Sequence, residues 1–163
     1  MIAGANDKGV CMFEFEYRKS VSEIKLRIAN TLKEDYVFGN HPLLKELEQQ
    51  TGEYFEGERT VFDLPLQLAG SPFQVKVWED LLKIPYGEKR TYKQQAIAYG
   101  DLKAIRAIAS ANGANGIAII VPCHRVVGSN GSLIGYGGGL ERKRWLLEHE
   151  QKHSLSLYQK ELF

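Results

Sequence analysis

An uninterrupted apolar run occupies residues 116–121 of this 163-residue chain, Gly-Ile-Ala-Ile-Ile-Val, and stops at Pro122. A run of this length is typical of a fully buried strand. A thiol and an imidazole follow at once, in Cys123 and His124, with Arg125 after them. The sequence therefore predicts a buried strand with reactive groups at its edge.

Cysteine reacts as the thiolate, and an unperturbed thiol with a pKa of about 8.5 is only a few per cent ionised at neutral pH. A neighbouring base or positive surroundings raise that fraction. His124 is the candidate base, and Arg125 adds positive potential. The alternative is a buried cysteine beside a hydrogen-bonded core histidine, and the adjacency of Cys123 and His124 does not by itself decide between the two.

A glycine-rich segment after the Cys-His pair favours the chemical interpretation. Residues 135–139 read Gly-Tyr-Gly-Gly-Gly, and such a loop can bring bare backbone N–H groups close to a ligand. Tyr136 adds a hydroxyl and a flat ring. Residues 140–150 then predict a helix with Trp145 and Leu146 as core positions.

The composition is that of a folded globular chain. Hydrophobic residues make up 44% and charged residues 25%, which are ordinary values and exclude wholesale disorder. No run approaches the roughly 18–20 apolar residues of a membrane span, and the start of the chain lacks an apolar signal-peptide core, so we expect a cytoplasmic protein. Two cysteines are too few for a disulfide framework or a zinc site, and Cys11 is expected to be a packed small hydrophobe. His41, His149 and His153 have no ligand-like spacing and are expected at the surface or at helix caps.

Charge is unevenly distributed along the chain. Residues 1–70 carry 8 Lys and Arg against 12 Asp and Glu, a balance of −4, whereas residues 71–163 carry 13 against 8, a balance of +5. The asymmetry favours an anionic partner for the second segment, although chance differences between solvated faces would look the same. Ser71 and Pro72 fit an N-cap and a first helical residue after turn-prone residues. We therefore predict two domains, residues 1–70 and residues 71–163.

The first segment is predicted to mix strands and helices. Residues 13–17 alternate aromatic and acidic side chains, the period of a half-buried strand, and residues 60–66 read as an edge strand. One helix is expected after an N-cap at Ser20 or Ser22, with apolar positions that include Ile24, Ile28 and Leu32. Another is expected from Pro42 to before Gly57.

Two short helices of the second segment fit a helix-turn-helix. They are Thr91–Tyr99 and Leu102–Asn112, and Asp101 can cap the second. The second helix is rich in alanine apart from Arg106, so its backbone can approach another surface closely. Close packing against another helix of the protein is the alternative, and it explains the alanines but not the cation among them.

Three motifs together resemble one known family. They are Val121-Pro122-Cys123-His124-Arg125-Val126, Gly135-Tyr136-Gly137-Gly138-Gly139-Leu140 and Trp145-Leu146-Leu147-Glu148-His149-Glu150. The sequence looks like an alkylguanine-DNA alkyltransferase, closely from Phe73 to Glu150 and more loosely before. The resemblance implies an α/β fold. A ribonuclease-H-like N-terminal α/β domain with a small, mainly antiparallel sheet would precede a mostly α-helical C-terminal domain that contains the helix-turn-helix.

The resemblance implies a single-use acceptor of alkyl groups. Cys123 would attack the alkyl carbon on the exocyclic 6-oxygen of guanine, or the 4-oxygen of thymine, in DNA. His124 would act as the base through a water, Glu150 would orient the imidazole, and Asn115 would brace the segment ahead of the nucleophile. Since a thioether is a poor leaving group, one molecule would repair one lesion, with no cofactor and no metal. The substrate contacts implied are Tyr136, the Gly137 N–H and the Val126 carbonyl.

Double-stranded DNA is the implied partner, bound by a monomer. The helix-turn-helix would enter the minor groove, and the damaged base would leave the stack at a cost of a few kcal/mol. Arg106 would fill the gap left by the base, and Tyr92 would push the phosphate that rotates the nucleotide. The DNA-binding residues implied are Tyr92, Arg106, Ala107 and Ser129.

The chain departs from the family pattern at three places, none of which removes a catalytic group. Gly116 stands where the family often has proline, Ala109 where many relatives have glycine, and Gly137 where a small residue such as Ser or Ala is usual. Two other functions stay open. A lesion-binding module without chemistry would not need Cys123, and a cysteine hydrolase would turn over repeatedly on an ester or amide.

Overall fold

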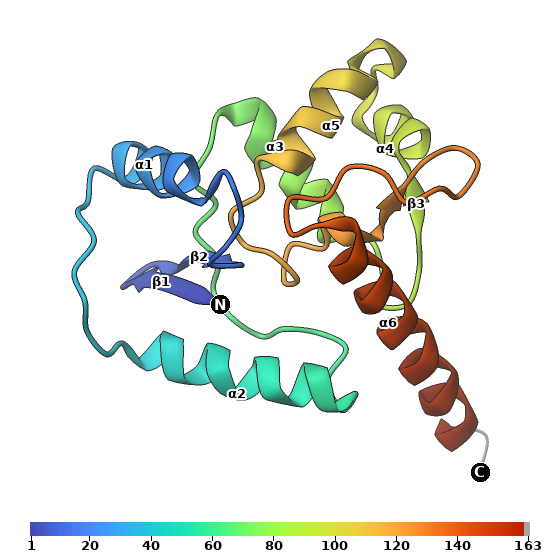
Figure 1. The fold of residues 1–163 in the computed structure, drawn as a ribbon, viewed down its shortest axis with the longest axis horizontal. Helices are drawn as coiled ribbons and strands as arrows, with labels where there is room; N and C mark the ends of the chain where they lie inside the picture. Colours follow the sequence, from blue (N-terminus) through green and yellow to red (C-terminus); the bar gives the residue numbers. More distant parts are fainter. Residues whose placement is uncertain (162–163) are drawn as a thin grey trace.

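In the computed structural model, the chain begins with a two-stranded antiparallel sheet between two helices. Strands β1 (Ile2–Asn6) and β2 (Gly9–Glu14) pair with each other. Helices α1 (Val21–Leu32) and α2 (Pro42–Glu56) lie on opposite sides of this hairpin (Figure 1). The expected small antiparallel sheet with helices is confirmed.

Helix α2 begins and ends at local capping signals, whereas the side chain of Ser20, before α1, makes no capping hydrogen bond. Ile24 and Ile28 of α1 are buried, as the predicted helical period requires. At the start of α2, Nδ1 of His41 accepts a hydrogen bond from the Leu43 N–H at 3.2 Å, which is the capping position expected for this histidine. The helix ends at Gly57, whose φ of 79° is in the left-handed region that glycine adopts freely.

The C-terminal part is helical, and its first helices are capped as the sequence predicts. The side chains of Ser71 and Thr91 each accept a hydrogen bond from the backbone N–H three residues later. In turn, the side-chain oxygens of Gln74 and Gln94 accept a hydrogen bond from the backbone N–H of the cap residue. Asp101 caps the next segment by accepting from the Lys103 N–H. The elements are α3 (Pro72–Leu81), α4 (Tyr92–Tyr99), the 3₁₀ turn η1 (Leu102–Ala104) and α5 (Ile105–Gly113).

The last helix, α6 (Leu140–Glu161), runs beyond Glu150, where the predicted helix stops. Its lower end projects from the body of the molecule in Figure 1. The structure describes the backbone of residues 1–161 and the side chains of residues 1–154. Residues 162–163 lie outside the described part of the chain.

Two predictions for side chains of α6 are wrong. Leu146 is buried as expected, but Trp145 is 49% exposed and lies on the outer face of the helix. There its ring stacks on His149, with centroids 4.8 Å apart. His149 is not at the surface but buried, with Nε2 2.8 Å from the Tyr54 carbonyl oxygen of α2. Helical period places a residue on a face, but the neighbouring α2 decides how much of that face is covered.

The strand predicted at residues 13–17 is placed too far along the chain. The observed strand β2 starts earlier and ends at Glu14. The Arg18 N–H donates to the Phe15 carbonyl at 3.1 Å and closes a turn, so the alternating side chains after Glu14 belong to that turn. Alternation of apolar and polar residues indicates which side chains are buried, but a turn can bury alternate side chains as well as a strand can.

The strand predicted at residues 60–66 is also wrong. One isolated bridge, between Val10 and Leu66, joins this segment to β2. The Val10 N–H donates to the Pro65 carbonyl at 2.8 Å, and the Val10 carbonyl accepts from the Gln67 N–H at 2.9 Å. Because proline has no N–H, the ladder cannot continue through Pro65.

The apolar run at residues 116–121 is fully buried but does not form the predicted strand. It makes a single bridge with β2, where the Ala118 N–H donates to the Phe13 carbonyl at 2.6 Å. The backbone then reverses, and the Val121 N–H donates to the Ile117 carbonyl at 3.0 Å. A continuous apolar run predicts that a segment is buried, and here the buried segment is a compact turn inside the core rather than a strand.

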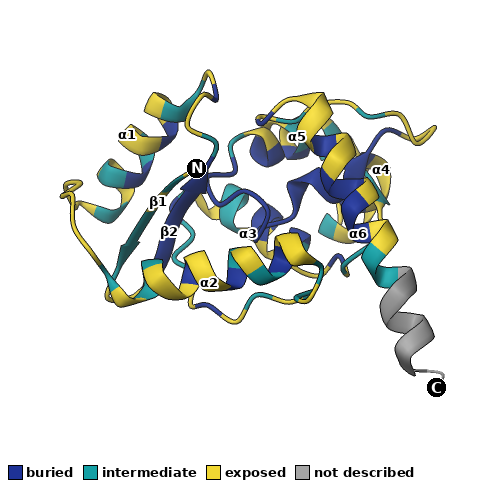
Figure 2. Cartoon of the chain, turned by 60° about the horizontal axis from the view of Figure 1, so that its bottom comes forward, coloured by how far each residue is buried: buried dark blue, intermediate teal, exposed yellow. Residues whose placement is uncertain are grey.

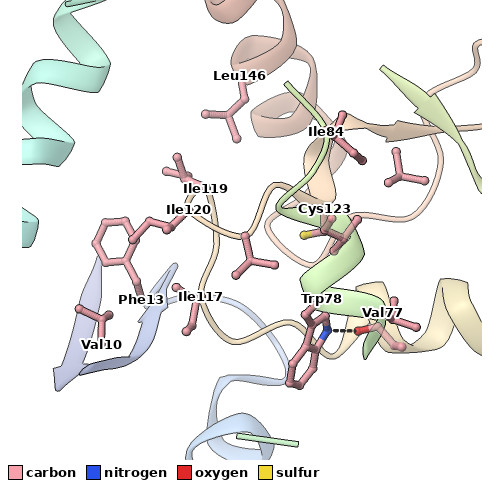
Figure 3. Packing of buried hydrophobic residues seen from close by; sticks show 14 of the residues in the cluster. Val10, Phe13, Val77, Trp78, Ile84, Ile117, Ile119, Ile120, Cys123 and Leu146 are labelled. Carbon is pink, nitrogen blue, oxygen red and sulfur yellow. Dashed lines mark hydrogen bonds between the residues drawn. The ribbon is translucent and has the colours of Figure 1, made fainter. Parts of the chain in front are cut away.

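The main core draws on both halves of the chain. Figure 3 shows Val10 and Phe13 of β2 with Trp78 of α3 and Leu146 of α6 around the buried turn, and Figure 2 shows buried residues gathered between the helices. The Trp78 indole N–H donates to the Ala111 carbonyl at 2.8 Å. The division at residue 70 therefore stays a prediction, since this core is continuous across it. Among the described residues, no helix has the length and apolarity that crossing a membrane requires.

Candidate active site

Cys123 lies in the core, at the start of a short 3₁₀ turn rather than at the edge of a long strand. The turn η2 (Cys123–Arg125) leads directly into β4 (Val126–Val127), which pairs in parallel with β3 (Arg90–Thr91). The Cys123 side chain is 7% exposed and lies among the apolar residues drawn in Figure 3. The two-residue pair with β3 and the buried turn before Pro122 hold the thiol in place.

Asn115 connects Cys123, the candidate nucleophile, to the buried turn. Its Nδ2 lies 3.3 Å from Sγ of Cys123 and donates to the Val121 carbonyl at 2.9 Å. Its Oδ1 accepts from the Ile117 N–H at 2.9 Å, and the side chain is 1% exposed. The structure thus brings together Asn115 and Cys123, which the sequence places eight residues apart.

The surroundings of Cys123 keep its thiol protonated at rest. Burial raises the pKa of the Cys123 thiol above its usual value; the hydrogen bond from Asn115 opposes this rise, Glu14 adds to it, and the charges of Arg18 and Lys143 oppose it. The net direction is upward, so a base must take the proton when the sulfur reacts.

His124 has the protonation state that such a base needs. It is fully buried, and Nε2 lies 2.8 Å from Oε1 of Glu150. Burial lowers the pKa of the imidazole, although Glu150 acts in the opposite direction. The neutral ring then carries its proton on Nε2, towards the carboxylate, and its lone pair on Nδ1. Within the described residues, Nδ1 has no hydrogen-bond partner, so it is free to accept a proton.

Glu150 is held by five donated hydrogen bonds at its two carboxylate oxygens. Besides His124, Arg125 donates through Nε at 2.9 Å and through Nη2 at 3.0 Å. The Tyr54 hydroxyl donates at 2.8 Å and the Gly87 N–H at 3.1 Å. Burial alone would raise the pKa of Glu150, but His124 and Arg125 outweigh it and hold that pKa well below its usual range. The carboxylate therefore stays charged and fixed in orientation.

Tyr136 lies next to the Cys-His pair. Its ring and that of His124 are 6.4 Å apart in an edge-to-face arrangement. Its hydroxyl is buried and has no hydrogen-bond partner among the described residues. Burial raises the pKa of the phenol well above its usual value, so the hydroxyl keeps its proton and can donate it to a ligand. The following Gly137 is exposed at the edge of the loop.

Lys143 is a site residue that the sequence analysis missed. It is fully buried in α6, and its Nζ donates to the Val126 carbonyl at 2.5 Å, the Ile134 carbonyl at 2.7 Å and the Gly135 carbonyl at 3.4 Å. Burial lowers its pKa to about 8, and Cys123 opposes this shift. The spacing of Lys143 with the buried Leu146 and Glu150 at one helical face was the available signal.

The residues expected to bind DNA line one groove, with one exception. Tyr92, Arg106 and Ser129 line a groove of about 450 Å³ between α4, α5 and the loop before Tyr136. Arg106 is exposed, whereas Tyr92 is 9% exposed and its hydroxyl points at the Ile134 and Gly135 carbonyls, 3.4 and 3.3 Å away.

Ala107, the exception, is exposed on α5 but is not among the residues that line the groove. The nearby cation Arg90 pairs with Asp80 at 2.9 Å. Among the residues that the structure describes, no group of three His, Cys, Asp or Glu side chains is placed to hold a metal ion.

Fold and site together define a class of proteins in which a helix-turn-helix lies beside a buried Cys-His pair. Residues 72–152 match the family described as 6-O-methylguanine DNA methyltransferase, DNA binding domain. The methylated-DNA–protein-cysteine methyltransferase of Methanosarcina barkeri is 42% identical over 153 residues, which cover 94% of this chain and 90% of that protein. The chain therefore belongs to the methylated-DNA–protein-cysteine methyltransferase family.

Two further comparisons cover a smaller share of each protein. The methylated-DNA–protein-cysteine methyltransferase of Mycolicibacterium paratuberculosis is 56% identical over 106 residues, which cover 65% of this chain and 64% of that protein. The Mycobacterium tuberculosis protein named OGT, solved in complex with DNA, has a TM-score of 0.65 and 54% identity over 66% of each chain. The chain thus spans just under two thirds of the length of these relatives.

Proposed function

We propose that this chain repairs alkylated DNA by moving a methyl group from the exocyclic 6-oxygen of guanine to Sγ of its own Cys123, one group per molecule. The observation that carries the proposal is the arrangement of His124, whose Nε2 is bound to Glu150 while Nδ1 has a free lone pair beside the Cys123 turn. Family membership supports the choice of substrate.

The proton of the thiol would go to His124. Because burial keeps the thiol protonated and the imidazole neutral, the proton moves from Sγ, through a water, to Nδ1 as the reaction proceeds. The imidazolium that forms is stabilised by the carboxylate of Glu150, which is already charged and oriented. The chemistry is a single displacement: an S–C bond forms, the C–O bond breaks, and the electron pair leaves with the guanine ring.

The departing guanine would be received by the loop after β4. Tyr136 keeps its proton and has an unpaired hydroxyl, so it can donate to the ring as negative charge develops there. The Gly137 N–H would face the substrate oxygen, and the Cys123 and Val126 carbonyls would accept from the exocyclic amino group. The Val126 carbonyl already accepts from Lys143, and a carbonyl oxygen has a second lone pair that can accept from the base.

Access to the site would require the base to leave the duplex. The apolar groove at Tyr92 and Arg106 lies between the helix-turn-helix and the loop that carries Tyr136. The exposed Arg106 projects from the alanine-rich α5 and would occupy the space vacated by the base. Phosphate contacts would supply affinity without sequence preference.

The test is the intact mass of the protein after incubation with a duplex oligonucleotide that carries one O6-methylguanine. We expect a gain of one methyl group, mapped to Cys123, and no further repair once the protein is consumed. Binding without any mass gain would favour a lesion-binding module, and repeated turnover would favour a hydrolase. Either result would overturn the proposal.

A further inference from the structure

Arg18 is a buried cation near the active site that comes from the turn after β2, far from the site motifs in sequence. It is 9% exposed and pairs with the carboxylate of Glu14, which is fully buried. Its Nε donates to the Ser20 hydroxyl at 2.9 Å, which fixes the plane of the guanidinium.

One edge of this guanidinium holds the segment that leads to the nucleophile. Nη1 donates to the Asn115 carbonyl at 2.9 Å, and Nη2 donates to the Gly113 carbonyl at the end of α5. Asn115 in turn contacts Sγ of Cys123 with its side chain. A chain of direct contacts therefore leads from Arg18 to the thiol and to the end of the alanine-rich helix.

The face of the same guanidinium supports the glycine-rich loop. A Cβ atom added to Gly137 would lie 2.3 Å from Cζ of Arg18, a distance that no side chain tolerates. A Cβ atom on Gly138 would lie 2.6 Å from the ring of Phe15, in the same turn as Arg18. The loop therefore rests on Arg18 and Phe15, and a side chain at 137 would displace the Arg18 guanidinium.

Resting on the function proposed above, we propose that Arg18 is a positioning residue for alkyl transfer. It holds the Asn115–Cys123 segment and the substrate loop at Gly137 at a fixed separation. The nucleophile and the substrate-binding loop are then placed by one rigid group from the N-terminal part of the chain.

The positive charge of Arg18 also lowers the pKa of the Cys123 thiol. The charged groups that face Cys123 are Glu14, which raises the pKa of the thiol, and Arg18 and Lys143, which lower it. The other titratable neighbours are His124, Tyr92 and Tyr136. Removing Arg18 removes a positive charge that lowers the pKa of the Cys123 thiol, so the thiol becomes harder to ionise.

The geometric test is a double-variant cycle on the rate of transfer from free O6-benzylguanine. It compares the wild-type protein, Arg18→Ala, Gly137→Ser and the double variant. We expect Gly137→Ser to slow transfer about tenfold when Arg18 is present and less than about threefold when it is replaced by alanine. An equal loss in both backgrounds would show that the loop does not rest on Arg18 and would overturn the proposal.

The electrostatic test separates positioning from simple support of the fold. The rate of Cys123 labelling by iodoacetamide is followed against pH for Arg18→Gln and Arg18→Lys. The pH at which labelling reaches half its maximal rate should rise for the neutral variant Arg18→Gln. It should return towards the wild-type value for Arg18→Lys, which keeps the charge. A midpoint unchanged in Arg18→Gln would contradict the proposal, as would a shift of the same size in Arg59→Ala, the matched control that loses an ion pair with Glu53 on α2.

The failure of this proposal is distinguishable from failure of the proposed function. A wild-type protein that takes no alkyl group from any substrate would reject the function. The same four-protein cycle, read as thermal unfolding midpoints, still tests the contact between Arg18 and Gly137. Should Arg18→Ala not fold, Arg18→Gln takes its place in the cycle, since it keeps a donor and most of the length.

Discussion

The two cysteines of the chain have the same exposure, and the structure gives them very different surroundings. Cys11 in β2 and Cys123 in η2 are each 7% exposed, and burial raises the pKa of both thiols. Around Cys11 the packing partners are apolar, and the charge that acts on it is the carboxylate of Glu34, which raises its pKa further. Around Cys123 lie an amide donor, a neutral imidazole, the carboxylate of Glu14 and two cations.

The comparison teaches that burial does not decide whether a thiol is a nucleophile. Cys11 even borders a pocket of about 360 Å³, so access to it is not the distinction. What differs is a nearby group that can take the proton and charges that favour the thiolate once it forms. Four experiments test this difference between the two thiols and their surroundings.

The largest expected effect comes from exchanging each cysteine for serine. Cys123→Ser should abolish methyl transfer, because an alcohol is too weakly acidic to replace the thiol here, while DNA binding is retained. Cys11→Ser should leave transfer at the wild-type level. Intact mass after exposure to methylated duplex checks both, and a methyl group found on Cys11, or retained transfer in Cys123→Ser, would break the contrast.

The next largest effect tests His124 as the general base. His124→Gln keeps a donor to Glu150 but removes the lone pair that accepts the thiol proton, so transfer should slow about 100-fold or more. Single-turnover kinetics with free benzylguanine measure it. His149→Gln is the matched control, since His149 is a buried histidine on α6 that bonds the Tyr54 carbonyl instead. Equal losses in the two variants would argue that any buried histidine here serves stability alone.

A smaller effect separates access from chemistry. Arg106→Ala should slow repair of duplex DNA about tenfold, because the flipped base loses the group that fills its gap. Reaction with free benzylguanine, which needs no flipping, should be unchanged. Lys103→Ala removes a cation from η1, outside the groove lining, and serves as the control. Parallel losses on duplex and free base would remove Arg106 from this role.

The smallest effect is the pH dependence. Because burial lowers the pKa of His124 below its ordinary value of 6.5, the imidazole stays neutral as pH falls through 6.5. The rate of transfer should therefore hold steady from pH 8 down through this value and fall only below it, when Nδ1 becomes protonated. A rate that halves at or above pH 6.5 would place His124 in a more solvated environment than the structure gives it.

Local sequence signals predicted the helices well, because caps and helix breakers act within a few residues. The cap at Ser71, the helix start at Thr91 and the helix end before Gly57 are read correctly from the sequence. The strands were predicted poorly. Residues 60–66 and 116–121 are buried or alternate as strands do, yet each pairs with β2 at one bridge only within the described chain. A strand needs a partner along its length, and the sequence does not show where the partner ends.

The residues of the candidate site likewise fall into those that the sequence predicted and those that it did not. The residues in its motifs, Cys123, His124, Tyr136 and Glu150, were named from the sequence because the family resemblance carries them. Arg18 and Tyr54 lie in the N-terminal part of the chain, and their contacts with Asn115 and Glu150 span about a hundred positions. No local pattern reports such contacts, since an arginine after a strand or a tyrosine in a helix has many ordinary uses.

Short-range capping signals and contiguous motifs were enough to predict most of the helix boundaries and the family, and the motifs make Cys123 rather than Cys11 the candidate nucleophile. The tertiary structure decided that the apolar run is a turn, that Lys143 and Arg18 are buried cations beside the thiol, and that one lone pair of His124 is left free. The reason is physical: protonation states and buried contacts are set by desolvation and by neighbours brought together from distant parts of the chain.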